Sequence, residues 1–275
     1  MKGRVLTIAL TAALVIIAIA FLLPQVWLFV LSLKSKAGVY AYPPRLISSD
    51  ESGANYAFVL TRTQLPWYLW NSVVVSLAAT IATMAIGAPA AYMLSREPFR
   101  QRDTIATGLL LAQMVSPIVL LVPLYGLIAQ MHLLDTHKGL VLVYAAVQLP
   151  FTIVVLRNFF DALPRSLFEA ALLDGASRAT TFRRIALPLI GPGLASVAIF
   201  NLALYWAEFG LALVLLDSQE RFTIPIGLFS FQSGYETEWQ LVAAASFIGL
   251  VPVLAAFLAL QRFFVAGLTS GATKG

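Results

Sequence analysis

The chain contains no cysteine and only two histidines among its 275 residues. Without cysteine it has no disulfide framework, no thiolate metal site and no cysteine nucleophile. The histidines, His132 and His137, flank a predicted loop in which Asp135 is the one acidic neighbour. This pattern is more typical of surface histidines than of metal ligands, so no metal site is expected.

Charged residues are also scarce, at 11% of the chain, whereas hydrophobic residues make up 60%. Soluble domains carry about 25% charged residues. The composition therefore predicts an all-α, multi-pass integral membrane protein in contact with lipid. We interpret the net charge of +5 as basic residues in cytoplasmic loops, and expect no nucleic-acid partner.

Nucleotide-binding and hydrolytic motifs are missing. The sequence has no Gly-x-x-x-x-Gly-Lys-Ser/Thr phosphate loop and no Gly-rich dinucleotide fingerprint, so the chain is not expected to use ATP alone. It also has no Gly-x-Ser-x-Gly or His-Glu-x-x-His motif. We expect a non-enzymatic protein without a cofactor of its own.

Six apolar runs are long enough to cross a bilayer, which takes about 20 helical residues. They cover approximately residues 5–33, 69–94, 104–130, 139–156, 193–216 and 240–260. The predicted division is a first transmembrane helix (1–33), an external loop (34–66), a core bundle of five helices (67–262) and a cytoplasmic tail (263–275). A cleaved signal peptide ending near Ala18-x-Ala20 is the alternative for the first run, but the run continues well past that pattern.

Six crossings place both termini on one side of the membrane. Twelve of the 18 Lys and Arg residues fall on that side, which the positive-inside rule assigns to the cytoplasm. Small residues at 87–91 predict close packing of the second helix against its neighbours. Pro117 and Pro123 in the third run indicate either a packing kink or a break that lines a pathway.

Polar residues inside the predicted spans are the candidates for a solute path. Asn201, Tyr205 and Glu208 are spaced so that one helix face carries all three. The full candidate set is Asn201, Tyr205, Trp206, Glu208, Gln113, Ser116 and Gln148. The alternative is that Glu208 pairs with another helix or with interfacial water, while the aromatic residues belong to the interfacial belt.

Residues 164–192 form a polar-rich segment between apolar runs. Ser166 and Glu169 have the spacing of a capping box after Pro164, and Gly175 is suited to end the helix they begin. A second helix is predicted from about Arg178 to Leu187. Ser177 is its expected cap, and Pro188 is expected to break it.

Two interpretations of this helix pair remain open on local grounds. It can be a docking surface for another protein, because small residues surround the bend. It can also be an amphipathic helix on the inner leaflet, with Arg178, Arg183 and Arg184 near anionic lipid.

The same segment resembles a known family. Glu169-Ala170-Ala171, Asp174-Gly175-Ala176, Phe182, Ile185 and Leu187-Pro188 are similar to the signature loop of the inner-membrane permease subunits of binding-protein-dependent ABC importers. The tail from Val265 to Gly275 resembles that of the carbohydrate-uptake subfamily, in particular the second maltose permease subunit. In one departure, Trp206-Ala207-Glu208 stands where the family commonly has Trp-Asn and an acidic residue.

The resemblance implies a type I ABC importer fold of six transmembrane helices, with coupling helices over 166–187. It implies ATPase-coupling roles for Glu169, Ala170, Ala171, Asp174, Gly175, Ala176 and Pro188. It also implies a homologous second permease subunit, an ATPase dimer that holds ATP and Mg, and an external binding protein that delivers a sugar, sugar derivative or polyol-phosphate.

Two other classes of function are weighed against this one. An ion-coupled secondary transporter would use Glu208 as its titrating carboxylate, but the spans offer no second acid, histidine or lysine as a proton relay. A structural scaffold would show no effect of solute on the ATPase activity of any partner.

Overall fold

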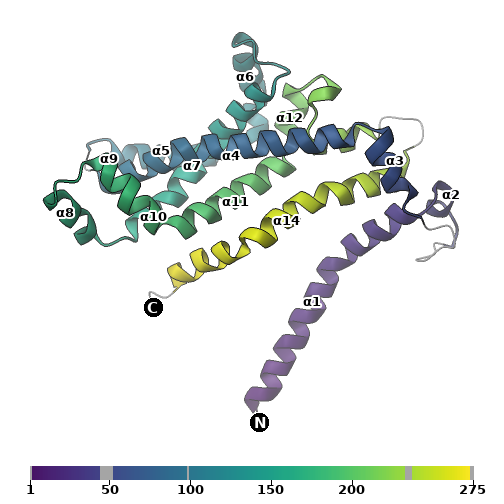
Figure 1. The fold of residues 1–275 in the computed structure, drawn as a ribbon, viewed down its shortest axis with the longest axis horizontal. Coiled ribbons are helices and arrows are strands. Elements are labelled where there is room, and N and C mark those ends of the chain that lie inside the picture. Colours follow the sequence, from purple (N-terminus) through teal and green to yellow (C-terminus); the bar gives the residue numbers. More distant parts are fainter. Residues whose placement is uncertain (1, 44–51, 98, 233–236, 273–275) are drawn as a thin grey trace. The chain divides into compact units, whose positions relative to one another are not determined.

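The computed structural model describes residues 2–43, 52–97, 99–232 and 237–272, and every regular element in these ranges is a helix (Figure 1). The all-α prediction is confirmed. Residues 44–51 of the expected external loop and residues 273–275 of the expected tail lie outside the described residues. The chain divides into two compact units, Met1–Pro66 with Gly227–Val251, and Trp67–Ile226 with Pro252–Gly275.

The first unit contains α1 (Lys2–Leu33), α2 (Lys36–Val39), α3 (Ala54–Arg62) and the first part of α14 (Trp239–Ala272). The hydroxyl oxygens of Ser32 and Tyr56 lie 2.6 Å apart, and the Asn55 amide donates to the Ser32 backbone oxygen at 2.8 Å. The Phe247 ring packs edge-on against Tyr56. Residues 34–66, expected as a loop, are therefore partly helical and contact the end of α1.

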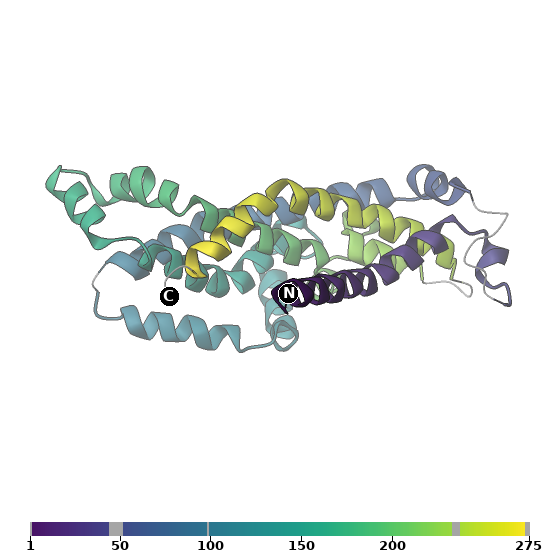
Figure 2. The same cartoon turned by 90° about the horizontal axis from the view of Figure 1, so that it is seen from below.

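The second unit contains the rest of the bundle. In chain order its elements are α4 (Leu65–Arg96), α5 (Arg102–Gln113), α6 (Pro117–Gln130), α7 (His137–Asp161), α8 (Arg165–Leu173), α9 (Arg178–Thr181), the π-helical turn η1 (Phe182–Ala186), α10 (Leu187–Leu189), α11 (Gly191–Ala207), α12 (Gly210–Leu215), the 3-10 turn η2 (Gln219–Arg221), α13 (Ile224–Ser230) and the second part of α14. Figures 1 and 2 place α8 and α9 together at one end of this unit, beside the C-terminal end of α4.

Four helices of the described chain are long and apolar enough to cross a membrane, and two bent helix pairs raise the number to six if each pair counts as one span. The four are Leu6–Leu33, Leu65–Arg96, His137–Asp161 and Trp239–Ala259. Each covers one of the expected apolar runs. The last of them continues as α14 through Pro252 to Ala272, so the helix does not end near 260 as predicted.

The expected third and fifth spans are not single straight helices. α5 and α6 meet at a bend of 102°. Pro117 opens α6, and Ser116 before it is extended with a ψ of 133°, as a residue preceding proline prefers. The expected helix over 193–216 is interrupted as well, because α11 ends at Ala207 and Glu208 has an extended backbone.

Two apolar clusters form the core of the second unit. One is built around Tyr144 and Tyr205, and the other around Tyr92 and Phe160. Both take residues from α4 and α7. At Gly87 on α4, an added Cβ would lie 2.8 Å from Cγ2 of Thr152 on α7, so the close packing predicted at the small residues is confirmed.

Asp135 joins two loops, one between α6 and α7 and the other after α12. Its carboxylate accepts hydrogen bonds from the backbone N–H groups of Asp217 and Ser218 at 3.0 Å each, and Arg221 lies 3.5 Å away. Burial alone raises the pKa of Asp135, but the hydrogen bonds from Ser218 and Asp217 and the charge of Arg221 outweigh it. The pKa of this carboxyl is therefore lower than usual.

Candidate functional site

The bend at Gly175 separates the two short helices of the predicted docking segment. Gly175 has a φ of +79°, its N–H donates to the Leu172 oxygen, and the Ala176 N–H donates to the Ala171 oxygen. These two bonds form a Schellman motif, which needs a residue in the left-handed region. The predicted helix end at this glycine is confirmed.

The start of α8 differs from the prediction. Pro164 occupies the N-cap position, the helix begins at Arg165, and no side chain caps it. Ser166 therefore lies inside the first turn, two residues after the N-cap position, and its hydroxyl does not cap the helix. The capping box of Ser166 and Glu169 is wrong.

The second helix of the pair begins as predicted but ends differently. Ser177 caps α9 by accepting a hydrogen bond from the Thr180 N–H at 3.2 Å. The chain then passes through η1 into α10, so helical backbone continues to Leu189 instead of breaking at Pro188. Proline is accommodated because it occupies the first turn of α10, where an N–H is not needed.

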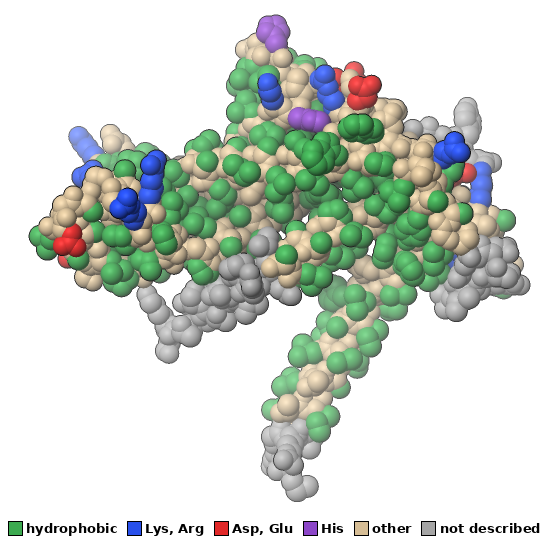
Figure 3. Space-filling model, viewed as in Figure 1, with side chains coloured by type: hydrophobic (Ala, Val, Ile, Leu, Met, Phe, Trp, Pro, Cys, Tyr) green, Lys and Arg blue, Asp and Glu red, His purple; other side chains and the backbone are tan. Residues whose placement is uncertain are grey.

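The tip of the helix pair exposes apolar side chains beside the bend. Leu173 is 88% exposed and Leu172 is 58% exposed. Glu169, Ala170 and Asp174 are also exposed, whereas Ala171 is buried. Figure 3 shows Lys and Arg side chains gathered at the same end of the second unit.

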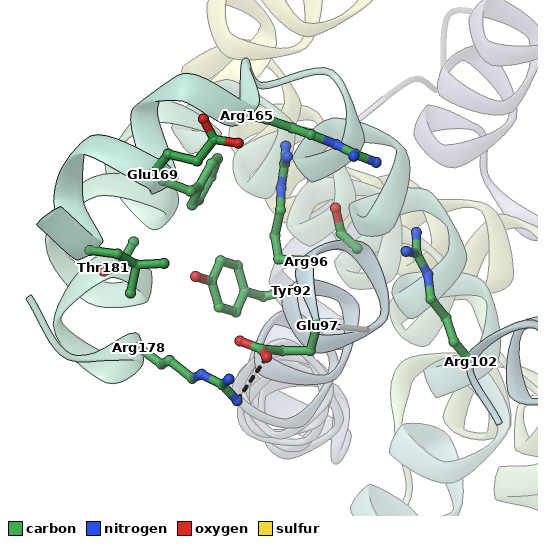
Figure 4. A pocket seen from close by; sticks show the side chains of 11 residues that line it. Tyr92, Arg96, Glu97, Arg102, Arg165, Glu169, Arg178 and Thr181 are labelled. Atoms are coloured by element: carbon green, nitrogen blue, oxygen red, sulfur yellow. Dashed lines mark ion pairs between the residues drawn. The ribbon is translucent and has the colours of Figure 1, made fainter. Parts of the chain in front are cut away.

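A cavity of about 350 Å³ lies between the helix pair and the end of α4 (Figure 4). The residues that line it are Tyr92, Ser95, Arg96, Glu97, Arg102, Arg165, Phe168, Glu169, Leu172, Arg178 and Thr181. Its floor is aromatic, since the Tyr92 ring packs against Phe168 and Phe182. The helix pair is thus attached to the bundle by charged and aromatic side chains.

The second candidate site is a buried polar layer. The Asn201 amide donates to the Thr152 hydroxyl at 2.9 Å, and Gln148 donates to the Asn201 oxygen at 3.3 Å. Tyr205 lies 2.7 Å from the hydroxyl of Thr83, which itself donates to a backbone oxygen of α4, so Tyr205 is the donor. Asn201 and Tyr205 are buried and saturated by α4 and α7.

Glu208 lies at the break between α11 and α12. Its carboxylate accepts from the Leu211 and Ala212 N–H groups at 2.9 and 3.1 Å, and from the Tyr144 hydroxyl at 2.9 Å. The Tyr144 and Tyr205 rings stack at 5.2 Å. Glu208 therefore caps α12 and bonds to α7, in line with the alternative that it pairs with another helix; because its backbone is extended, it is not on the helix that carries Asn201 and Tyr205.

The other candidate path residues lie elsewhere. Gln113 and Ser116 are exposed at the bend between α5 and α6, and the Gln113 amide contacts its own helix. Trp206 lines an apolar cavity of about 210 Å³ with residues of α4 and α14, including Ser76 and Phe257. These three positions are not part of the buried polar layer, and their role in a solute path stays a prediction.

Sequence reasoning missed the residues that complete both sites. Thr83, Thr152 and Tyr144 hold the polar layer, and Arg96 and Glu97 hold the coupling segment. Thr83 and Thr152 were not distinctive because threonine is common in apolar helices. Arg96 and Glu97 lie between the apolar runs 69–94 and 104–130, and no motif marks them.

Comparison with known proteins identifies the family. Residues 84–269 match the family described as binding-protein-dependent transport system inner membrane component. The diacetylchitobiose uptake system permease protein DasC of Streptomyces coelicolor is 33% identical over 95% of each chain. The trehalose/maltose transport system permease protein MalG of Thermococcus litoralis is 34% identical over 98% of this chain and 97% of its own.

Solved structures show the same fold. A chain of a bacterial ABC transporter that imports the acidic polysaccharide alginate superimposes with a TM-score of 0.81 at 22% identity, covering 96% of this chain and 98% of its own. A chain of the methionine ABC transporter MetNI gives a TM-score of 0.61 at 17% identity, covering 74% and 95%. The type I permease fold is thereby confirmed.

The alternative of an ion-coupled transporter that titrates Glu208 is wrong, because the family works within ABC importers and Glu208 is committed to capping. The chain belongs to the inner-membrane permease components of binding-protein-dependent ABC importers.

Proposed function

We propose that this permease subunit translocates a sugar or sugar derivative and that α8, α9 and η1 dock on a cytoplasmic ATPase subunit. The observation that carries the docking role is the tip at Gly175, where a closed Schellman turn presents the exposed Leu172 and Leu173. Apolar side chains at an exposed helix tip fit a protein groove. Glu169, Ala170, Ala171, Asp174, Gly175, Ala176 and Pro188 are the proposed coupling residues.

The competing lipid-surface interpretation of the helix pair is weaker. It needs Arg178 at the membrane surface, but the Arg178 guanidinium pairs at 2.7 Å with Glu97, the residue after the end of α4. The helix pair is thereby tied to the bundle and not free to lie along a leaflet. Twelve of the 18 Lys and Arg residues are assigned to the side of the membrane that holds both termini. This count and the ion pair support a cytoplasmic position for α8 to α10.

The partners follow from the family. We infer a second, homologous permease subunit, an ATPase dimer that binds ATP and Mg, and an external binding protein that delivers the solute. ATP-driven closure of the ATPase dimer moves the coupling helices, and the spans rock from inward-open to outward-open as largely rigid bodies. The chain itself performs no hydrolysis in this scheme.

The solute class rests on the named relatives, which take up diacetylchitobiose and trehalose or maltose. Amide and hydroxyl groups such as those of Asn201, Tyr205 and Gln148 are suited to a neutral polyol. Because these groups hydrogen-bond to one another or to Thr83 and Thr152, we infer that the layer borders the solute path and holds its helices together.

Substitution of Gly175 tests the coupling role. A valine there finds open space around its Cβ but is strained by the φ of +79°. We expect Gly175→Val to insert and fold normally while ATP-coupled uptake by the assembled transporter is lost. Uptake in proteoliposomes and ATP hydrolysis are the measurements.

Two variants control for this test. Gly175→Asn should retain part of the activity, because asparagine tolerates the left-handed region. Gly191→Ala, at another glycine with open space and no such constraint, should behave as the parent. Full coupled uptake by Gly175→Val would refute the docking role.

A further inference from the structure

Arg96, the last residue of α4, and Glu97, which follows it, contact different parts of the helix pair formed by α8 and α9. Arg96 donates from one guanidinium nitrogen to the backbone oxygens of Phe160, at the end of α7, and of Leu163, at 2.8 Å. The same guanidinium lies over the Phe168 ring of α8, 4.2 Å from its centroid. One side chain thus joins α4, the end of α7 and the first coupling helix.

Glu97 contacts α9, the second of the two short helices. Its carboxylate pairs with Arg178, the first residue of α9, at 2.7 Å. The Glu97 side chain is 16% exposed, whereas that of Arg178 is 75% exposed, so the pair is shielded from water only on the Glu97 side. Figure 4 shows Arg96 and Glu97 directed toward opposite sides of the cavity, with Tyr92 between them.

α4 connects this end to the opposite end of the second unit without a break. It is one helix of 32 residues, about 48 Å long at 1.5 Å per residue. Near its start, the Asn71 amide donates to the backbone oxygens of Glu220 and Phe222, and the Ser72 hydroxyl accepts from the Ile224 N–H at 2.7 Å. Both ends of α4 are therefore fixed to other elements by specific hydrogen bonds.

From this arrangement we propose that Arg96 and Glu97 are positioning residues that transfer movement of α8 and α9 to α4, which carries it to the loop over 220–224. The proposal rests on the proposed docking of α8 and α9 on the ATPase. It assigns the transfer to two side-chain links on one helix and not to the apolar packing beneath them. The two links have different chemistry, so they can be broken separately.

The test uses the assembled transporter with a reporter at the far end of α4. The chain has no cysteine, so Glu220→Cys in a complex whose other subunits are cysteine-free provides a single labelling site. Maleimide labelling of this site is compared with and without ATP and orthovanadate, and ATP hydrolysis is measured in parallel. A change in labelling with nucleotide reports that movement has reached the 220–224 loop.

We expect Arg96→Ala to keep ATP hydrolysis and to lose the nucleotide-dependent change in labelling. Arg96→Lys should lose it too, because an ammonium cannot donate to both carbonyls and stack on the ring at once. Arg100→Ala, at an exposed arginine of the following loop, is the matched control and should keep the change. An unchanged response in Arg96→Ala would overturn the role of Arg96.

The ion pair offers a rescue experiment. Glu97→Arg and Arg178→Glu should each abolish the nucleotide-dependent change, and the double swap should restore it. Because a merely structural defect would be compounded by two substitutions, restoration supports the link, and a double variant as defective as the singles refutes it. If Arg96→Ala does not assemble, the Glu97 and Arg178 variants still test the transfer of movement through α4.

The outcome separates this inference from the proposed function. If Gly175→Val loses the response but the Arg96 and Glu97 variants keep it, the docking role stands and the transfer through α4 is wrong. If Gly175→Val keeps coupled uptake, the docking role itself fails.

Discussion

Glu208 shows how one carboxylate is accommodated within an apolar bundle. An ionisable group at the bilayer centre costs about 2.5 kcal/mol or more, so it must be compensated by protein contacts. Here two backbone N–H groups of α12 and the Tyr144 hydroxyl supply the hydrogen bonds. The carboxylate in turn satisfies donors that the break after Ala207 leaves exposed.

Replacing this carboxylate should therefore destabilise the protein. We expect Glu208→Ala to lower the free energy of unfolding by about 2 kcal/mol or more, since losing a cap costs about 1 kcal/mol and a buried unpaired hydroxyl costs about 1 to 3 kcal/mol. Thermal unfolding in detergent is the measurement. Glu220→Ala, at an exposed glutamate of the next loop, is the control, and equal stability of the two variants would contradict the capping role.

Residue spacing predicted which residues share a helix face better than it predicted their hydrogen-bond partners. The spacing of Asn201 and Tyr205 correctly placed them on one helix face, because helical periodicity is a local property, whereas Glu208 lies beyond the end of that helix. The groups that saturate them, such as Thr152 and Thr83, come from helices far away in the sequence. No local pattern marks such partners, so the bonding of the layer became visible only in three dimensions.

Among the helices, the contact of α4 with α7 depends on a missing side chain. An added Cβ at Gly87 would lie 2.8 Å from Cγ2 of Thr152, closer than real contacts allow. The Thr152 hydroxyl must stay in place because it accepts the bond from Asn201. The threonine therefore has little freedom to move aside.

Even a methyl group should disturb this contact. We expect Gly87→Ala to lower the melting temperature, because overpacking costs about 1 to 3 kcal/mol. Adding Thr152→Ser removes the clashing methyl group but keeps the hydroxyl, and should restore most of the loss. Gly108→Ala, on α5 with open space around its Cβ, should leave the melting temperature unchanged or raise it. No rescue by Thr152→Ser would show that the contact is not limiting.

Elements with strong end signals were predicted most accurately. Gly175 and Ser177 act through their own backbone neighbours, and both signals were correct. The helix break expected at Pro188 does not occur there, because the proline follows a π-helical turn and occupies the first turn of α10. The bend before Pro117 was expected either as a packing kink or as a break that lines a pathway, since the sequence does not reveal how large a proline bend will be.

At the scale of the whole molecule, the family is a component of binding-protein-dependent transport systems, and the motor that we propose is a separate ATPase dimer. In proteoliposomes we expect the chain alone to show neither ATP hydrolysis nor uptake driven by a proton gradient. Uptake should appear when the second permease, the ATPase dimer and the binding protein are added with ATP. Proton-driven uptake by the chain alone would contradict this prediction.

The same preparation identifies the solute class. Trehalose, maltose and diacetylchitobiose form a suitable first panel, with binding to the external protein measured first and uptake second. Methionine serves as the negative control, because a likeness of fold to the methionine transporter says nothing about the solute of this chain.

The buried polar layer also fixes the register of the bundle. Along each of α4, α7 and α11, polar positions such as Thr83, Gln148 and Asn201 lie between residues of the two apolar clusters. Sliding one of these helices by a single turn, about 5.4 Å, would strand an amide or hydroxyl against hydrocarbon. We therefore expect the three helices to move as one body. The hinges of a transport cycle are then expected where the helices are broken, at 114–116, 190 and 208–209.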